Sequence, residues 1–255
     1  MSSSEDILTL PAPKADARVA YGSDENQFID LRLPHGKAAH ALAIFIHGGF
    51  WRARYDLGYG GHMCAALTAQ GIATANVEYR RAGNAGGGWP GSFADIRGAY
   101  QFLLQNAGRH GFEPGRVIVA GHSAGGQLAL CLAAHENLTA AISLAGVVDL
   151  QQAYSLHLSN DAVVEFLGGT PTQVKEHYQE ADPMKLSIRS KQWLVHGSAD
   201  DIVPPSFSRD YVKAKRKKDE RVEWMEIARA GHFDLVDPRS TAWKEVARVV
   251  ENALA

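Results

Sequence analysis

The chain has 255 residues, of which 45% are hydrophobic and 21% charged, so it suits one large α/β domain or two small ones with ordinary globular composition. The formal net charge of −2 gives no attraction to nucleic acid or to an anionic membrane surface. No stretch approaches the roughly 18 uninterrupted apolar residues of a membrane-spanning helix, and the acidic N-terminus lacks the pattern of a secretory signal.

The cysteine and histidine content argues against a disulfide framework and against a metal site. Cys64 and Cys131 both fall in apolar patterns of helical spacing, so we expect two buried thiols and a cytoplasmic protein. Eleven histidines are present, and none shows a spacing typical of zinc ligation. No metal and no cofactor is therefore expected.

The first half of the chain alternates between strand and helix patterns. Residues 1–26 are polar and contain two prolines, which indicates a loose arm followed by an edge strand. The elements after this arm are predicted as strands at 27–33, 41–46 and 72–79, with helices at 61–70 and 92–106. The second of these helices opens with Ser92-Phe-Ala-Asp95, a capping-box pattern.

Residues 117–126 carry the most informative pattern. A β-branched run at 117–119 predicts a buried strand, which breaks into Gly121-His-Ser-Ala-Gly125 and then into the helix-forming stretch 127–134. A strand, a sharp G-x-S-x-G turn and a helix form the context of a nucleophile elbow, in which glycines leave room around a strained serine. The other interpretation is an ordinary glycine-rich turn. We interpret Ser123 as the candidate nucleophile.

The second half returns to the same alternation after an irregular stretch. A strand at 140–145 is followed by short helices and loops over 147–190, where Thr170-Pro171 predicts the start of a helix to about Ala181. The remaining elements are a strand at 192–196, a helix at 205–217, a strand at 221–227 and a last helix capped by Asp237-Pro238.

Strands that alternate with helices predict the α/β class, with a doubly wound and mainly parallel sheet. We expect one domain over residues 1–255, with the irregular stretch 147–190 projecting as a small cap. Ligands bind at the carboxyl ends of the strands in such sheets.

Candidate partners of Ser123 follow two later strands. Asp200 and Asp201 come directly after the strand at 192–196, and His232 follows the strand at 221–227. A weak serine nucleophile needs an imidazole to take its proton and a carboxylate to orient that imidazole. We predict Ser123, Asp200 and His232 as the catalytic residues. Asp201 and Asp149 remain alternative acids, and a surface-loop histidine is the other interpretation of His232.

An oxyanion hole requires two backbone N–H donors near the nucleophile. One is predicted at Ala124, directly after the nucleophile, and the other at Gly49 or Phe50, in the loop that follows the strand at 41–46. His47 opens this loop, and we interpret it as a structural residue that pins the loop rather than as a base.

Three further residues are candidates for substrate binding. Trp51 and Trp89 come from loops at the predicted active-site end, and would favour a flat aromatic or apolar group if they line the pocket. The alternative for Trp51 is packing beneath the loop. His122 is the third candidate, although its ring is expected to pack away from the nucleophile.

Arg80 and Arg81 follow a strand at the same end of the sheet. Either could meet a substrate carboxylate, but we favour structural ion pairs with Glu78 or Asp95.

Four motifs together resemble the α/β-hydrolase superfamily over nearly the whole chain: His47-Gly48-Gly49, the elbow Gly121–Gly126, His196-Gly-Ser-Ala-Asp200 and Ala230-Gly-His232. The His-Gly-Gly-x-Trp loop resembles the kynurenine formamidase branch. It is equally similar to bacterial esterases of the acetyl-xylan and feruloyl type, and to compact relatives of prolyl oligopeptidases.

The residue chemistry and the resemblance imply a cofactor-free serine hydrolase that cleaves a small ester or an N-acyl or N-formyl arylamine. A kynurenine formamidase, a small peptidase and a catalytically silent binding module remain the alternatives. The expected partner is a small-molecule ester or amide substrate, with neither nucleic acid nor membrane. The oligomeric state stays open, a homodimer included.

Overall fold

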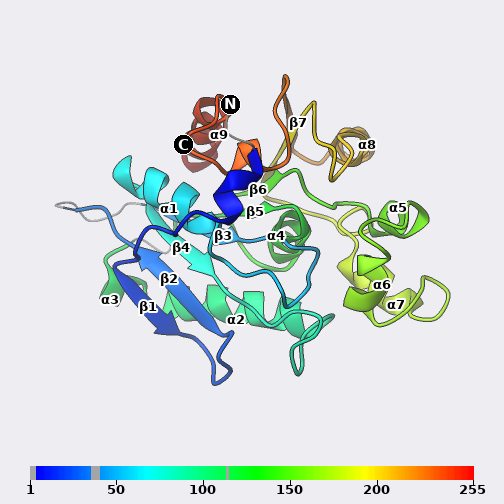
Figure 1. Cartoon of the computed structure of the whole chain (residues 1–255), viewed down its shortest axis with the longest axis horizontal. Coiled ribbons are helices and arrows are strands. Elements are labelled where there is room, and N and C mark those ends of the chain that lie inside the picture. Colours follow the sequence, from blue (N-terminus) through cyan, green and yellow to red (C-terminus); the bar gives the residue numbers. More distant parts are fainter. Residues whose placement is uncertain (1–3, 36–40, 113–114) are drawn as a thin grey trace.

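The computed structural model describes residues 4–35, 41–112 and 115–255 (Figure 1). Within these ranges one sheet is built from eight strands: β1 (Ala17–Ala20), β2 (Phe28–Arg32), β3 (Leu42–Ile46), β4 (Ala73–Val77), β5 (Val117–His122), β6 (Ala140–Leu144), β7 (Lys191–Gly197) and β8 (Val222–Ile227). Their order across the sheet is β1-β2-β4-β3-β5-β6-β7-β8. Two of the described pairs, β1–β2 and β2–β4, are antiparallel, and the other five are parallel. The predicted α/β class with a mainly parallel sheet is confirmed.

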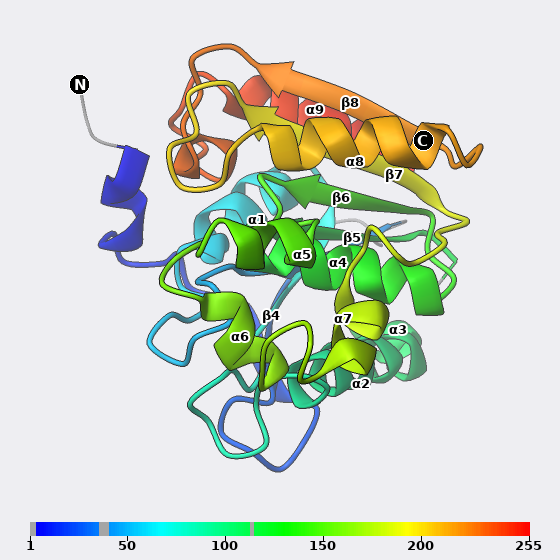
Figure 2. The ribbon, with the colours of Figure 1, turned by 90° about the vertical axis from the view of Figure 1, so that its right-hand side faces the viewer.

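Helices cover both faces of this sheet. The described ranges contain α1 (Gly60–Ala69), α2 (Gly91–Gln105), α3 (Ala107–His110), α4 (Ala124–His135), α5 (Leu150–Ser155), α6 (Ala162–Leu167), α7 (Lys175–Ala181), α8 (Ser206–Arg216) and α9 (Trp243–Leu254), with short 3₁₀ helices η1 (Ser4–Leu8) and η2 (Phe233–Leu235). Figure 2 shows α4 and α8 in front of the strands, with α1 and α9 behind them.

Strand β3 shows why the central strands read as continuous apolar runs. Its five residues are all buried. Leu42, Ile44 and Ile46 pack into the core beneath α2 and α4, whereas Ala43 and Phe45 pack into the core beneath α1 and α9. Because side chains alternate along a strand, only an apolar run satisfies a strand that is covered on both faces.

Three predicted helix caps were wrong, although the helix predicted at 92–106 is present as α2. Ser92 lies inside α2 and donates to the Arg80 carbonyl at 2.6 Å instead of capping the helix. After Thr170 the chain makes a turn, and α7 begins at Lys175. Asp237 pairs with Arg239 in a turn, and α9 begins at Trp243.

The N-terminal arm is more ordered than its composition suggests. Residues 4–8 form η1, whose Ile7 side chain is fully buried in the core beneath α1 and α9. Residues 1–3 of the predicted arm lie outside the described residues. The edge strand that follows is β1, as predicted.

Both cysteines are free and buried, which confirms the expected buried thiols. In the described ranges, no helix combines the length and apolar character needed to cross a membrane.

The irregular stretch 147–190 contains α5, α6 and α7, which gather beside α4 in Figure 1. Val163, Phe166 and Leu167 of α6 are buried against the same core as α2 and α4. This stretch is therefore packed onto the body of the sheet through apolar side chains.

Candidate active site

Ser123 lies at a sharp turn between β5 and α4. Its backbone angles, φ 56° and ψ −121°, fall in a region that side chains rarely adopt. A Cβ at Gly121 would lie 2.0 Å from the Gly125 carbonyl oxygen, and one at Gly125 would lie 2.1 Å from the Ile46 carbonyl oxygen. The turn can therefore form only with glycine at both positions, which is the geometric meaning of the G-x-S-x-G pattern.

His232 and Asp200 come together from the carboxyl ends of β8 and β7. The His232 Nδ1–H donates to Asp200 Oδ2 at 2.7 Å, and both side chains are buried. Parallel neighbouring strands bring their carboxyl ends to the same edge, so two loops that are 32 residues apart meet there.

Asp200 is held in its charged form by a set of donors. Burial favours the protonated acid, but hydrogen bonds from His196 and His232 and from the backbone N–H of Val203 outweigh it and hold the pKa of Asp200 below its ordinary value. Asp201 points into solvent, since its residue is exposed. Asp149 caps α5, accepting from the Gln152 N–H at 2.8 Å.

Ser123, His122 and His232 face one cavity of about 280 Å³. Most of its other walls are aromatic or apolar, and include Gly49, Phe50, Tyr55, Tyr59, Ile202 and Phe233. Among the described residues, no group forms a hydrogen bond with Ser123 Oγ, which is buried. With Nδ1 of His232 bound to Asp200, its Nε2 is the nitrogen left for the cavity.

The loop after β3 lies against the nucleophile. A Cβ on Gly48 would stand 2.8 Å from the Ser123 Cβ. Gly49, Phe50 and Trp51 all have positive φ, at 105°, 52° and 57°. Within the described ranges no acceptor takes the backbone N–H of Gly49, Phe50 or Ala124. These three N–H groups are therefore free to bind an anionic oxygen near Ser123.

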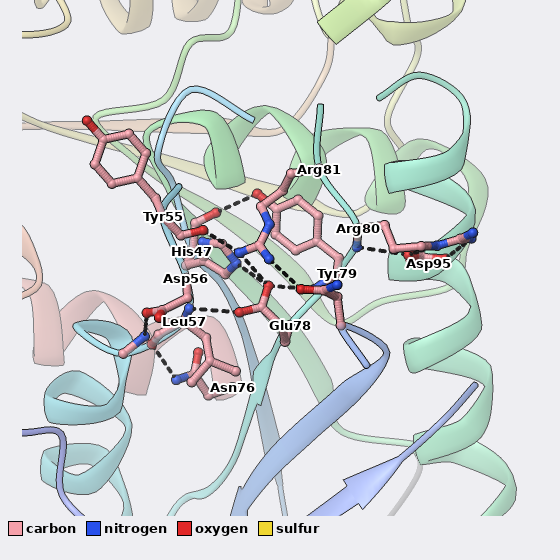
Figure 3. Close-up of polar contacts among 12 residues, drawn as sticks. His47, Tyr55, Asp56, Leu57, Asn76, Glu78, Tyr79, Arg80, Arg81 and Asp95 are labelled. Carbon is pink, nitrogen blue, oxygen red and sulfur yellow. Dashed lines mark hydrogen bonds and ion pairs between the residues drawn. The ribbon is translucent and has the colours of Figure 1, made fainter. Parts of the chain in front are cut away.

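A buried charge network supports this loop from behind (Figure 3). His47 Nε2 bonds Glu78 Oε1 at 3.0 Å, and its ring stacks on Tyr79 with centroids 4.6 Å apart. Arg81 pairs with the same Glu78 oxygen at 2.8 Å and also donates to the Tyr55 carbonyl. Burial raises the pKa of Glu78, but the charge and hydrogen bond of His47, the charge of Arg81 and the backbone N–H of Tyr79 outweigh it, so the net shift is downward. The prediction that His47 pins the loop agrees with this arrangement.

Arg80 makes the other predicted ion pair. Its guanidinium binds Asp95 at 2.7 Å, and Asp95 also accepts from the Arg80 backbone N–H (Figure 3). Both arginines are thus committed to structural carboxylates, as favoured from the sequence.

The structure does not bring Trp51 or Trp89 to the cavity. Trp51 is buried beneath the loop, where its indole N–H donates to Gln127 at 3.0 Å and its ring stacks on Phe166 at 4.6 Å. Trp89 stacks on Phe93 at 5.2 Å and meets the same Phe166 edge-on. Since neither lines the cavity, the substrate-binding prediction for both residues is corrected to packing, of Trp51 against α6 and α4 and of Trp89 against α6 and α2.

His122 belongs to the cavity wall, and the residue is buried. Both of its ring nitrogens are bound to protein groups, Tyr59 and the His232 carbonyl. Substrate contact by its ring edge stays a prediction.

The chain also matches a known protein family. The family model described as BD-FAE matches residues 29–214, which is more than half of the chain. The protein belongs to the BD-FAE family. That places it among α/β-hydrolase esterases, in agreement with the resemblance seen in the four motifs.

Curated relatives of this BD-FAE protein include two esterases. Esterase LipC of Mycobacterium tuberculosis is 27% identical, over 88% of this chain and 61% of the relative. A probable isoprenylcysteine alpha-carbonyl methylesterase, ICMEL1 of Oryza sativa subsp. japonica, is 22% identical over 92% of this chain and 62% of the relative. The chain thus spans about three fifths of the length of these two relatives.

Solved structures share the fold of the BD-FAE protein. A truncated carbohydrate esterase from gut microbiota aligns with a TM-score of 0.81 at 19% identity, over 95% of this chain and 97% of the other. Esterase Est2 of Thermogutta terrifontis with bound propionate aligns with a TM-score of 0.74 at 22% identity, over 94% and 93% of the two chains. At these identities the likeness shows the α/β-hydrolase fold alone.

Sequence reasoning missed several cavity residues. Tyr55 and Tyr59 come from the segment between the loop after β3 and α1, and Leu8 comes from η1. Phe233 sits next to His232, and that adjacency was a usable signal. No sequence signal pointed to Leu8, because the sequence of a polar arm does not show that burial of Ile7 would anchor the arm beside the site.

Proposed function

We propose that the protein is a serine carboxylesterase that hydrolyses small esters. One observation carries this proposal. A strained serine with a buried hydroxyl free of described partners shares a cavity with His232, whose other nitrogen is bound to a buried aspartate. Membership of an esterase family agrees with it. Ser123, His232 and Asp200 are then the catalytic residues.

The reaction runs in two steps on this scaffold. Ser123 Oγ attacks the ester carbonyl while Nε2 of His232 takes its proton, and the C–O bond to the alcohol breaks as the same nitrogen protonates the leaving oxygen. Asp200 keeps His232 in the Nδ1–H tautomer and stabilises the imidazolium. Water activated by His232 then attacks the acyl-enzyme, releasing the acid and Ser123.

The oxyanion that forms in each step needs donors that are already in place. The N–H groups of Gly49, Phe50 and Ala124 are the proposed donors, since they are unused among the described residues. Ala124 also begins α4, whose positive end faces the turn. A donor of this kind contributes about 100-fold or more to the rate.

The cavity volume favours a small substrate. About 280 Å³ lies at the lower end of common ligand pockets. Phe50, Tyr55 and Phe233 give it aromatic walls, which also suits an arylformamide, so kynurenine formamidase activity is the second candidate. A peptidase or a silent binding module has no observation in its favour.

We further propose that residues 1–255 act as one hydrolase domain with 147–190 as a small cap, and that its partner is a small-molecule ester or amide. Cytoplasmic location and oligomeric state stay predictions.

Two specificity constants on one preparation test the proposal: kcat/KM for p-nitrophenyl acetate and for N-formylkynurenine. An ester value of about 10⁴ M⁻¹s⁻¹ or more, well above the formamide value, is expected. The opposite ratio would favour the formamidase, and no turnover of either would overturn the proposal. A Ser123→Ala preparation purified in parallel controls for contaminating esterases.

A further inference from the structure

A chain of hydrogen bonds crosses the wall of the cavity from the loop after β3 to the loop after β8. The Gly48 N–H donates to Tyr59 Oη at 2.6 Å, Tyr59 Oη lies 2.9 Å from His122 Nδ1, and His122 Nε2 lies 3.1 Å from the His232 carbonyl oxygen. Tyr59 is 8% exposed and His122 1%, so water does not replace these bonds.

The two ends of this chain fix the direction of their own bonds, and with a neutral His122 they also fix the bond between Tyr59 and His122. A backbone N–H only donates and a carbonyl only accepts. His122 Nε2 therefore carries the proton that reaches the His232 carbonyl. Tyr59 accepts from Gly48, and its one proton goes to His122 Nδ1 when that ring is neutral with its proton on Nε2. Of the two neutral tautomers of His122, only the Nε2–H form completes all three bonds, and an imidazolium would leave the buried Tyr59 hydroxyl proton without His122 as its acceptor.

We infer that Tyr59 and His122 are positioning residues, which lock the loop after β3, with its proposed oxyanion donors, and the His232 backbone to the nucleophile elbow. This inference rests on the proposed esterase function. The elbow itself supplies His122, directly before Ser123 in the chain. One chain of hydrogen bonds thus links the three loops of the site, and it includes neither the Asp200–His232 contact nor Ser123 Oγ.

The surroundings of His122 favour its neutral form. Burial lowers its pKa well below the ordinary value, and the neighbouring His232 lowers it further, against the opposing charge of Asp200. His196 acts in the same direction as His232. A neutral ring matters here because the centroids of His122 and His232 are 4.5 Å apart, and a second cation would oppose the imidazolium that forms on His232 during turnover.

Replacing Tyr59 by Phe removes one hydroxyl and leaves the ring. We expect kcat for p-nitrophenyl acetate to fall about 10- to 50-fold with KM within about threefold, because misplaced donors act on the transition state. Tyr100→Phe is the matched control, since the hydroxyl of this buried tyrosine donates a hydrogen bond to the Asn137 carbonyl, which does not line the cavity. Its kcat should stay within about twofold. Unchanged kcat in Tyr59→Phe would overturn the inference.

A double-mutant cycle tests whether the two residues act as one chain. His122→Gln can still donate to the His232 carbonyl but no longer reaches Tyr59. In that background Tyr59→Phe should cost less than about threefold in kcat, whereas independent roles would give multiplied losses. If the two losses in kcat multiplied, Tyr59 and His122 would not act through one shared chain of hydrogen bonds.

Nitrogen NMR of the resting wild-type enzyme decides the tautomer without any turnover. A protonated Nε2 and a bare Nδ1 on His122 from pH 5 to 8 are expected. A protonated ring or the Nδ1–H tautomer would overturn the inference even in an active esterase. An enzyme that hydrolyses no ester but shows the expected tautomer would overturn the proposed function alone.

Discussion

His232 with Asp200 and His47 with Glu78 form two buried histidine–carboxylate pairs at the same edge of the sheet, at 2.7 and 3.0 Å. They differ in what remains on the second ring nitrogen. His47 Nδ1 is bound to the Gly48 carbonyl at 2.8 Å, and its carboxylate is shared with Arg81. His232 keeps Nε2 for a cavity that also holds the Ser123 hydroxyl.

The comparison shows that a carboxylate partner does not make a histidine a base. Proton transfer needs a free nitrogen that faces a reacting atom. His47, with both nitrogens engaged and a stacked Tyr79, holds the loop after β3 in place. Four predictions test this division of labour, beginning with the largest effect.

Removing the proposed nucleophile or its proposed base should abolish turnover. We expect Ser123→Ala and His232→Ala each to lower kcat by roughly 10⁴- to 10⁶-fold while the melting temperature stays within a few degrees. Ester hydrolysis and thermal unfolding measure the two effects. A His232→Ala enzyme with one tenth of wild-type activity would contradict the role of His232 as the base.

Replacing Asp200, the proposed orienting acid, should lower kcat somewhat less. Asp200→Asn is expected to lower kcat by about 10³- to 10⁴-fold, because the amide no longer holds the tautomer of His232. Asp201→Asn is the matched control, since its exposed side chain should be replaceable with activity within about twofold. If only Asp201→Asn lost activity, Asp201 rather than Asp200 would be the acid that orients His232.

Breaking the second pair should act mainly on stability. Glu78→Gln leaves Arg81 buried without its carboxylate, so the free energy of unfolding should fall by about 3 kcal/mol and kcat by about tenfold. Urea titration and ester kinetics measure both. Glu245→Gln, in an exposed pair with Arg248, should change stability by less than about 0.5 kcal/mol. A Glu78→Gln variant with full stability but no activity would make His47 the better base.

The pH dependence of stability should show the charged state of Asp200. Its pKa is lower in the folded than in the unfolded protein, so the unfolded state binds more protons below about pH 4. The stability that Asp200 contributes is complete above that range and is lost as the pH falls through it. In Asp200→Asn, the fall in the free energy of unfolding at low pH (the acid limb) should be smaller by on the order of 2 kcal/mol. An unchanged acid limb in urea titrations from pH 2 to 6 would contradict a charged Asp200.

Local patterns predicted most of the sheet and the elbow, because each depends on residues close in sequence. The apolar run before Ser123 and the glycines around it follow directly from steric limits on the turn. The placement of Asp200 and His232 after successive strands was also visible, since parallel strands end at one edge.

Long-range packing could not be predicted in the same way. Trp51 lies beneath its loop because Phe166 and Gln127, far along the chain, form the surface it packs on. The role of Tyr59 depends on two partners, Gly48 and His122, from different strand ends. No spacing in the sequence encodes either contact.

Covalent labelling of the native protein with a fluorophosphonate, followed by peptide mass spectrometry, tests the central claim most directly. We predict one adduct per chain, on Ser123, with a labelling rate at least about 100-fold slower in His232→Ala and little changed in Glu245→Gln. No adduct at Ser123 in a protein that still hydrolyses esters would contradict the account.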